Sequence, residues 1–173
     1  DGRTTIISKA AVWAARKGIF VCSSAGNSAG PPWYKITAPA DADSILTVGA
    51  VDSMGWVASF SSRGPTYDGR IKPNTAARGV SAIVAYQGGD VIGESGTSFS
   101  SPITAGALAC LWQAHPTATN QQVLDAIHQS ASQYTTPDTL MGYGIPDFCF
   151  ANSILHVMIG IDEERWCRNA VCL

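Results

Sequence analysis

The stretch Gly96-Thr97-Ser98-Phe99-Ser100-Ser101-Pro102 stands directly before a long apolar run over residues 103–112. A turn that contains glycine and precedes such a run predicts a loop followed by a buried helix at 98–114. Ser98 then lies at the helix N-terminus, beside free backbone N–H groups and the positive end of the helix dipole. These groups would stabilise a negative tetrahedral intermediate on the serine oxygen. Alternatively, Thr97 or Ser98 is simply the N-cap, a role that both residue types favour.

A second segment supplies a partner for this serine. Gly18-Ile19-Phe20-Val21-Cys22-Ser23-Ser24-Ala25-Gly26-Asn27 reads as a short buried strand, 18–25, that ends in a tight turn. Asn27 therefore follows the carboxyl end of a strand, where open α/β sheets build their sites. Its side-chain amide is able to donate to an oxyanion, and the alternative is an ordinary turn asparagine.

Five motifs, in order along the chain, resemble those of the subtilases, the subtilisin-like serine proteases. Residues 96–106 resemble the nucleophile motif, and Ser24-Ala25-Gly26-Asn27 resembles the oxyanion-hole segment. The other three are Ala38-Pro39-Ala40 with the strand 45–52, Phe60-Ser61-Ser62-Arg63-Gly64-Pro65, and Ile71-Lys72-Pro73-Asn74-Thr75-Ala76-Ala77-Arg78-Gly79. The chain departs from the family at Asn74, usually aspartate, and at Arg78, usually proline. The resemblance covers most of the chain and fades after about residue 153.

The resemblance implies an α/β fold that is part of a subtilisin-like parallel-sheet sandwich, with helices on both faces and without the N-terminal strands. Residues 1–156 would form the C-terminal half of the peptidase domain, and 157–173 a tail of uncertain structure. It also implies that Ala38-Pro39 is a cis peptide. A protein or peptide would be the substrate.

The family triad runs aspartate, histidine, serine along the chain. All three histidines here, at 115, 128 and 156, follow Ser98. The resemblance therefore implies that the histidine base and the aspartate lie on a missing N-terminal half of the domain. That half is the expected binding partner of this chain. His115 ends the same predicted helix, roughly 25 Å from Ser98 at the α-helical rise, and is excluded as a base. His128 is expected to be a surface or packing residue.

The resemblance assigns roles to six residues. Ser98 would be the nucleophile, and Asn27 would hold the oxyanion together with the Ser98 backbone N–H, with Thr97 assisting. Ser24, Ala25 and Gly26 would form one wall of the pocket for the residue before the scissile bond. No cofactor is implied for the reaction, although a structural calcium ion in the full domain fits the family.

Composition agrees with a piece of an α/β enzyme. Hydrophobic residues make up 46% of the 173 residues and charged residues 14%, against about 25% charged in ordinary globular domains. This low share of charged residues indicates that part of the surface of this chain is covered by another half of the same domain. A net charge of −2 with scattered basic residues gives no sign of nucleic-acid binding. No apolar stretch is long enough to span a bilayer.

The five cysteines contain no Cys-x-x-Cys pair, which argues against a zinc site. Cys22 and Cys110 lie in apolar segments and are expected to be buried. The chain opens without a secretory signal, whereas the resemblance implies a secreted or periplasmic protein.

The remaining pattern predicts helices and strands around these motifs. Further helices are expected at 4–17, 119–131 with Thr119 as its cap, and 151–156. Further parallel, doubly buried strands are expected at 45–51 and 80–86, and Gly88-Gly89 predicts a hairpin turn.

Three functions remain open at this point. The first is the C-terminal part of an active subtilase. The second is a catalytically inactive truncated subtilase or pseudoprotease that binds peptide or a partner. The third is an unrelated serine hydrolase or a non-enzyme.

Overall fold

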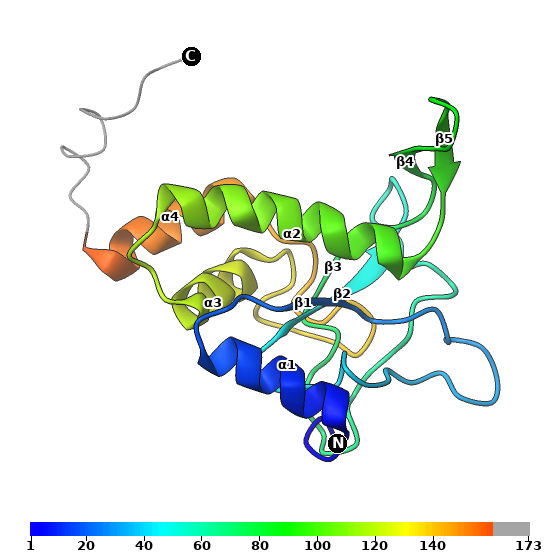
Figure 1. Cartoon of the computed structure of the whole chain (residues 1–173), viewed down its shortest axis with the longest axis horizontal. Helices are drawn as coiled ribbons and strands as arrows, with labels where there is room; N and C mark the ends of the chain where they lie inside the picture. Colours follow the sequence, from blue (N-terminus) through cyan, green and yellow to red (C-terminus); the bar gives the residue numbers. More distant parts are fainter. Residues whose placement is uncertain (161–173) are drawn as a thin grey trace.

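A three-stranded parallel sheet organises the molecule (Figure 1), whose computed structural model describes residues 1–160. The strands are β1 (Cys22–Ser24), β2 (Leu46–Val51), β3 (Thr75–Arg78), β4 (Ala82–Ala85) and β5 (Val91–Glu94). The helices are α1 (Ile6–Arg16), α2 (Thr97–Ala114), α3 (Asn120–Ser130) and α4 (Phe148–Ile159). The predicted α/β class with a parallel sheet is confirmed.

The sheet has the order β1-β2-β3, and β2 is buried along its whole length. Cys22 pairs with Leu46, and Val48 pairs with Thr75. A continuous apolar run such as 46–51 is typical of a strand covered on both faces. Among the described elements, β1 pairs only with β2, so its other edge is open.

The core lies between β2 and the three later helices. Leu46 and Val48 of β2 pack there with side chains of α2, α3 and α4, including Leu108, Val123, Ile127 and Leu155. A smaller cluster joins α1 to the segment before β2 through Ala15, Ala42 and Ile45. In Figure 1, α1 and α2 accordingly lie on opposite sides of the sheet.

The third predicted parallel strand is wrong. Residues 80–86 contain β4, which pairs antiparallel with β5 in a projecting hairpin (Figure 1). The third parallel strand is β3, in a segment for which no strand was predicted. Its Thr-Ala-Ala-Arg sequence lacks the β-branched apolar pattern of a central strand, because pairing with β2 rather than side-chain propensity places it. The hairpin turn at Gly88-Gly89 is confirmed.

The helices follow their predicted positions with one correction. Thr119 caps α3 with a reciprocal capping box to Gln122, as its sequence predicts. The helix expected at 151–156 is longer, because Asp147 caps its start and Gly160 adopts the left-handed conformation that ends it. The tail beyond residue 160 lies outside the described residues.

The expectation that α2 is buried on nearly all sides is wrong for this chain. Its face toward β2, α3 and α4 is buried, but the opposite face is exposed, from Pro102 and Ile103 through Gly106 to Ala109 and Cys110. The expected burial of Cys110 therefore fails, and Cys22 is only half-buried. The apolar side chains on this exposed face of the helix therefore lack part of their packing among the described residues.

Two further features concern the peptide before Pro39 and the length of the helices. The Ala38–Pro39 peptide is cis, as the resemblance implied. Over residues 1–160, every helix is too short or too polar to pass through a lipid bilayer.

Candidate active site

Ser98 lies in the first turn of α2 with its side chain exposed. The chain enters this helix through Gly96, whose N–H donates to the Gly79 carbonyl at 2.7 Å. A Cβ on Gly79 would fall 2.6 Å from the Ala50 Cβ and 2.9 Å from the Gly96 oxygen. Glycine at position 79 is thus required for the approach of the serine turn to β2.

Asn27 follows β1 and lies against the same helix start. Its Oδ1 accepts hydrogen bonds from the Thr97 N–H at 2.9 Å and from the Thr97 hydroxyl at 2.8 Å. Both donors fix which end of the amide faces α2, so the Nδ2 donor is left to point away from Thr97. The structure therefore brings the predicted nucleophile and oxyanion donor to one place, from segments 70 residues apart.

Thr97 holds the Asn27 loop from the helix side. Only 1% of its surface is exposed, and its hydroxyl accepts from the Gly26 N–H at 3.1 Å while donating to Asn27. Its hydroxyl is thereby engaged as both donor and acceptor. This arrangement favours an effect of Thr97 through Asn27 over direct contact with a substrate.

The three residues expected to line a substrate pocket continue directly from β1. Ser24 pairs with Val48, and the Ala25 N–H donates to the Val48 carbonyl at 2.9 Å. The Ala25 methyl group is buried against Ile36 and Ala40. Ser24 and Gly26 are half-buried. Their role in substrate binding stays a prediction.

The three histidines lie away from Ser98. His115 follows the C-terminus of the continuous helix α2, and its Nε2 lies 2.8 Å from the Asn152 Oδ1. His156 packs edge-on against His115, with ring centroids 4.6 Å apart. His128 stacks on Tyr143 at the start of β3, the opposite end of the sheet from Asn27.

A buried polar cluster at that opposite end was not anticipated from the sequence. The Lys72 ammonium, almost fully buried, donates to the Ile45 carbonyl, the Thr47 hydroxyl and the Asn74 Oδ1 at 2.8, 3.1 and 2.6 Å. All three acceptors are neutral. Burial, together with the charge of Arg70, lowers the pKa of Lys72 to about 7. The sequence feature that could have indicated this cluster is Asn74, which stands where the family usually has aspartate. Asparagine at this position leaves Lys72 without a carboxylate partner.

His128 completes this cluster. Its Nε2 lies 3.1 Å from the Asn74 Nδ2, which donates because the Asn74 Oδ1 already accepts from Lys72 and the Thr47 N–H. Burial lowers the pKa of His128 to about 4, and the nearby Lys72 charge acts in the same direction. His128 is therefore neutral at ordinary pH and is a packing residue, as expected.

Lys72 gives the chain a predictable pH dependence. The pKa of a lysine in an unfolded chain is about 10.4, so between about pH 7 and pH 10.4 the unfolded chain binds more protons than the folded one. Stability from this group therefore rises with pH, by up to about 1.4 kcal/mol per unit. We expect Lys72→Met to remove this rise when thermal unfolding is followed from pH 7 to pH 10. Equal slopes in both proteins would show that Lys72 keeps its proton throughout.

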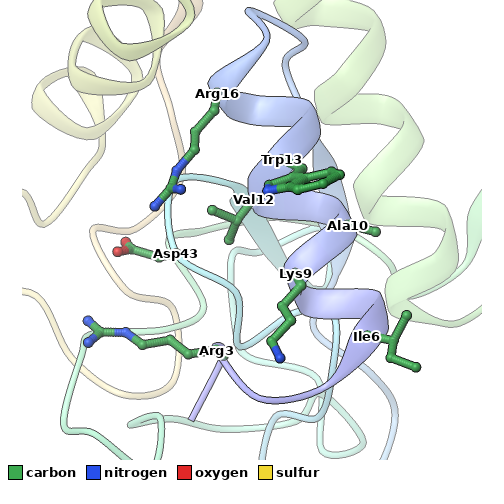
Figure 2. Close-up of a pocket in the computed structure, with 9 residues that line it drawn as sticks. Arg3, Ile6, Lys9, Ala10, Val12, Trp13, Arg16 and Asp43 are labelled. Atoms are coloured by element: carbon green, nitrogen blue, oxygen red, sulfur yellow. The ribbon is translucent and has the colours of Figure 1, made fainter.

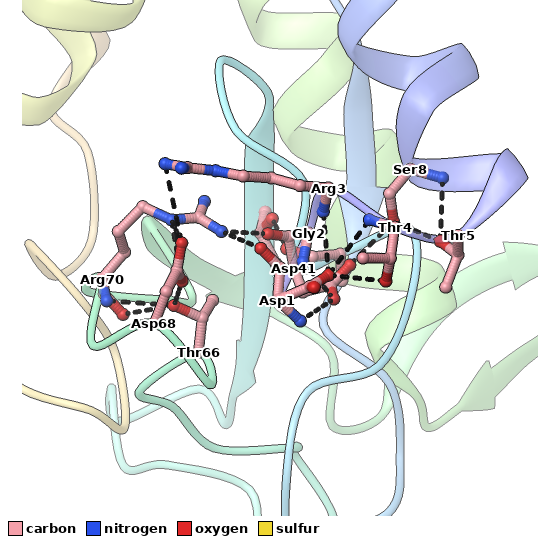
Figure 3. A network of polar contacts seen from close by, with 12 residues as sticks. Asp1, Gly2, Arg3, Thr4, Thr5, Ser8, Asp41, Thr66, Asp68 and Arg70 are labelled. Atoms are coloured by element: carbon pink, nitrogen blue, oxygen red, sulfur yellow. Dashed lines mark hydrogen bonds and ion pairs between the residues drawn. The ribbon is translucent and has the colours of Figure 1, made fainter.

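A second polar network anchors the segment before α1 (Figure 3). Asp41 accepts from the Gly2 N–H at 2.8 Å and the Ser8 hydroxyl at 2.9 Å. Burial raises the pKa of Asp41, but these hydrogen bonds outweigh it and leave the pKa below its ordinary value. Arg70 donates to the Asp41 backbone carbonyl at 2.8 Å and forms an ion pair with Asp68. The hydrogen bonds that Arg70 donates to the Asp68 carboxylate lower the pKa of Asp68 strongly.

A hollow of about 690 Å³ runs along α1 (Figure 2). Ile6, Val12 and Trp13 line it together with basic side chains such as Lys9 and Arg16. It shares no residue with the Ser98 cluster, and no serine, threonine or cysteine lines it. Across the described part of the chain, no three His, Cys, Asp or Glu side chains are grouped to hold a metal ion.

Comparison with known sequences gives a consistent result. The profile of the Subtilase family, Peptidase_S8, matches residues 1–144. Serine protease AprX of Bacillus subtilis (strain 168) is 35% identical over 147 residues, covering 73% of this chain and 33% of AprX. Subtilisin of Bacillus pumilus is 38% identical over 130 residues, covering 74% of this chain and 43% of that protein.

Solved structures share the fold. The self-cleaved protease domain of PatA matches with a TM-score of 0.70 and 27% identity, over 86% of this chain and 54% of that one. The prenylagaramide maturation protease PagA matches with a TM-score of 0.71 and 26% identity, over 85% and 54%. The chain thus spans little more than half of these structures and less than half of the two sequence relatives.

Proposed function

This chain belongs to the subtilase family, and from that premise we propose that it is the C-terminal part of a serine endopeptidase domain. It carries the nucleophile Ser98 and the oxyanion donor Asn27. The observation that supports the proposal is the pair of hydrogen bonds to the Asn27 Oδ1 from Thr97, the residue before Ser98, which leaves the Nδ2 donor of Asn27 outside these bonds.

In this proposal the Ser98 Oγ attacks the carbonyl carbon of a peptide bond. A histidine on the remaining part of the domain takes the serine proton and later gives it to the leaving amine, and an aspartate there orients that histidine. The Asn27 Nδ2 and the Ser98 N–H donate to the oxygen that becomes negative. Collapse of this intermediate releases the amine and leaves an acyl-enzyme on Ser98, which water then hydrolyses.

The partner that this proposal requires is the other half of the domain. It would pair with the open edge of β1 and cover the exposed face of α2 around Ile103 and Gly106. The short span of this chain relative to its relatives supports that partner. The substrate is a protein or peptide, and the extracellular halolysin-like protease Nep of Natrialba magadii, 32% identical, supports secretion.

A catalytically inactive truncated subtilase is the second candidate. One observation favours it: each of the three histidines packs away from Ser98 within the described residues. Such a chain would keep the β1 edge as a binding surface for peptide or for a partner.

The 173-residue chain alone should show no turnover, because a base within hydrogen-bond reach of Ser98 is required to activate its hydroxyl. The measurement is hydrolysis of a panel of chromogenic peptides by the purified chain, with Ser98→Ala as the control. Turnover by the chain that disappears in Ser98→Ala would mean that its own residues supply the base. Restored turnover after adding the other half would instead identify the source of the histidine.

A further inference from the structure

The loop that carries Asn27 is held from two sides. Thr97 holds it from α2, and the segment 60–62 holds it from the sheet side. The Ser62 N–H donates to the Gly26 carbonyl at 2.8 Å, and the Ser62 Oγ accepts from the Ser28 N–H at 2.9 Å. One serine thus bonds both chain neighbours of Asn27.

Ser62 is built into the fold and is not exposed to a substrate. Only 1% of its surface is accessible. A Cβ on Gly26 would come to 3.0 Å from the Ser62 Oγ, and Gly26 has a φ of 101°. Glycine at position 26 therefore allows both this backbone conformation and the close approach of Ser62.

Asn27 needs support of this kind because it is exposed. Thr97 fixes only the oxygen end of the Asn27 side chain, and both Asn27 and Ser28 are exposed residues. A shift of about 1 Å in a catalytic group can lower a rate by as much as 100-fold. We infer that Ser62 is a positioning residue that aims the Asn27 amide at the oxyanion. The inference rests on the proposed peptidase function.

Ser61 provides a matched control within the same turn. It is equally buried, at 1%, and its Oγ accepts one backbone N–H, from Ala50 of β2 at 3.0 Å. Alanine at either position deletes one buried hydroxyl that accepts a backbone N–H. Only the Ser62 change loosens the Asn27 loop.

The test compares Ser62→Ala, Ser61→Ala, Asn27→Ala and the double variant Ser62→Ala/Asn27→Ala in the complete protease, with a chromogenic peptide substrate. We expect Ser62→Ala to lower kcat by about 10-fold with KM within about twofold. Ser61→Ala should leave kcat within about twofold. In the Asn27→Ala background, Ser62→Ala should have no further effect on kcat, because the Asn27 amide through which Ser62 acts is already absent.

Two outcomes overturn the inference. One is equal kcat in the Ser62→Ala and Ser61→Ala variants, and the other is an undiminished Ser62→Ala effect in the Asn27→Ala background. A wild-type protease without turnover would instead refute the proposed function. Should Ser62→Ala fail to fold, residue-resolved hydrogen exchange on the wild type decides, since the Ser28 amide must be protected if Ser62 binds it.

Discussion

Ser98→Ala in the complete protein should lower kcat by about a million-fold and leave KM within about twofold, by analogy with the nucleophile change in subtilisin, a relative of this chain. In the proposed mechanism the hydroxyl forms the covalent bond to the substrate, and its loss removes the route through an acyl-enzyme. The fold should survive, because the described residues make no hydrogen bond to the Ser98 side chain and it is exposed.

Steady-state kinetics with a peptide substrate measures this effect. Ser95→Ala is the control, since Ser95 is also exposed and lies just ahead of α2, where its hydroxyl accepts from the Ser81 N–H. We expect its kcat to stay within about twofold of the wild type. Full activity in Ser98→Ala would assign the nucleophile to another residue.

Asn27→Ala should lower kcat by roughly 100- to 1,000-fold with little change in KM, a range that comes from subtilisin, a relative of this chain. In the proposed mechanism the Nδ2 donor acts on charge that develops only in the transition state, so substrate binding should change little. The measurement separates kcat from KM in the complete protein. An effect confined to KM would make Asn27 an ordinary turn residue.

A control asparagine lies in α3. Asn120 donates a side-chain hydrogen bond to the Ala15 carbonyl at 2.7 Å, which joins α3 to the end of α1. Asn120→Ala removes a comparable hydrogen bond without touching the Ser98 cluster. We expect a loss of stability of about 1 kcal/mol and an unchanged kcat.

The two segments of the candidate site could be found in the sequence because each is a local pattern. A serine before an apolar run and an asparagine after a strand each have a fixed position relative to their own element. That parallel strands and the following helix bring them together was an inference from fold class. The hydrogen bonds of Thr97 to Asn27 were not predictable, because side-chain contacts over 70 residues leave no periodic signal.

The missed features share one physical cause. β3 is a strand because it pairs with the edge of β2, and its own residues show no strand pattern. The bare face of α2 could not be distinguished from a buried one, since both are apolar. The cluster around Lys72 depends on oxygens from two separate segments, the Ile45 carbonyl and Thr47 hydroxyl from one and the Asn74 amide from the other. In each case tertiary contacts, and not local propensity, decide the outcome.

Under the proposed function, the link between Thr97 and Asn27 would also make catalysis depend on the order of folding. It closes a loop of 70 residues, and long loops close late because their ends must lose much conformational freedom before any contact forms. A chain that is still folding therefore has a serine but no oriented amide to stabilise an oxyanion.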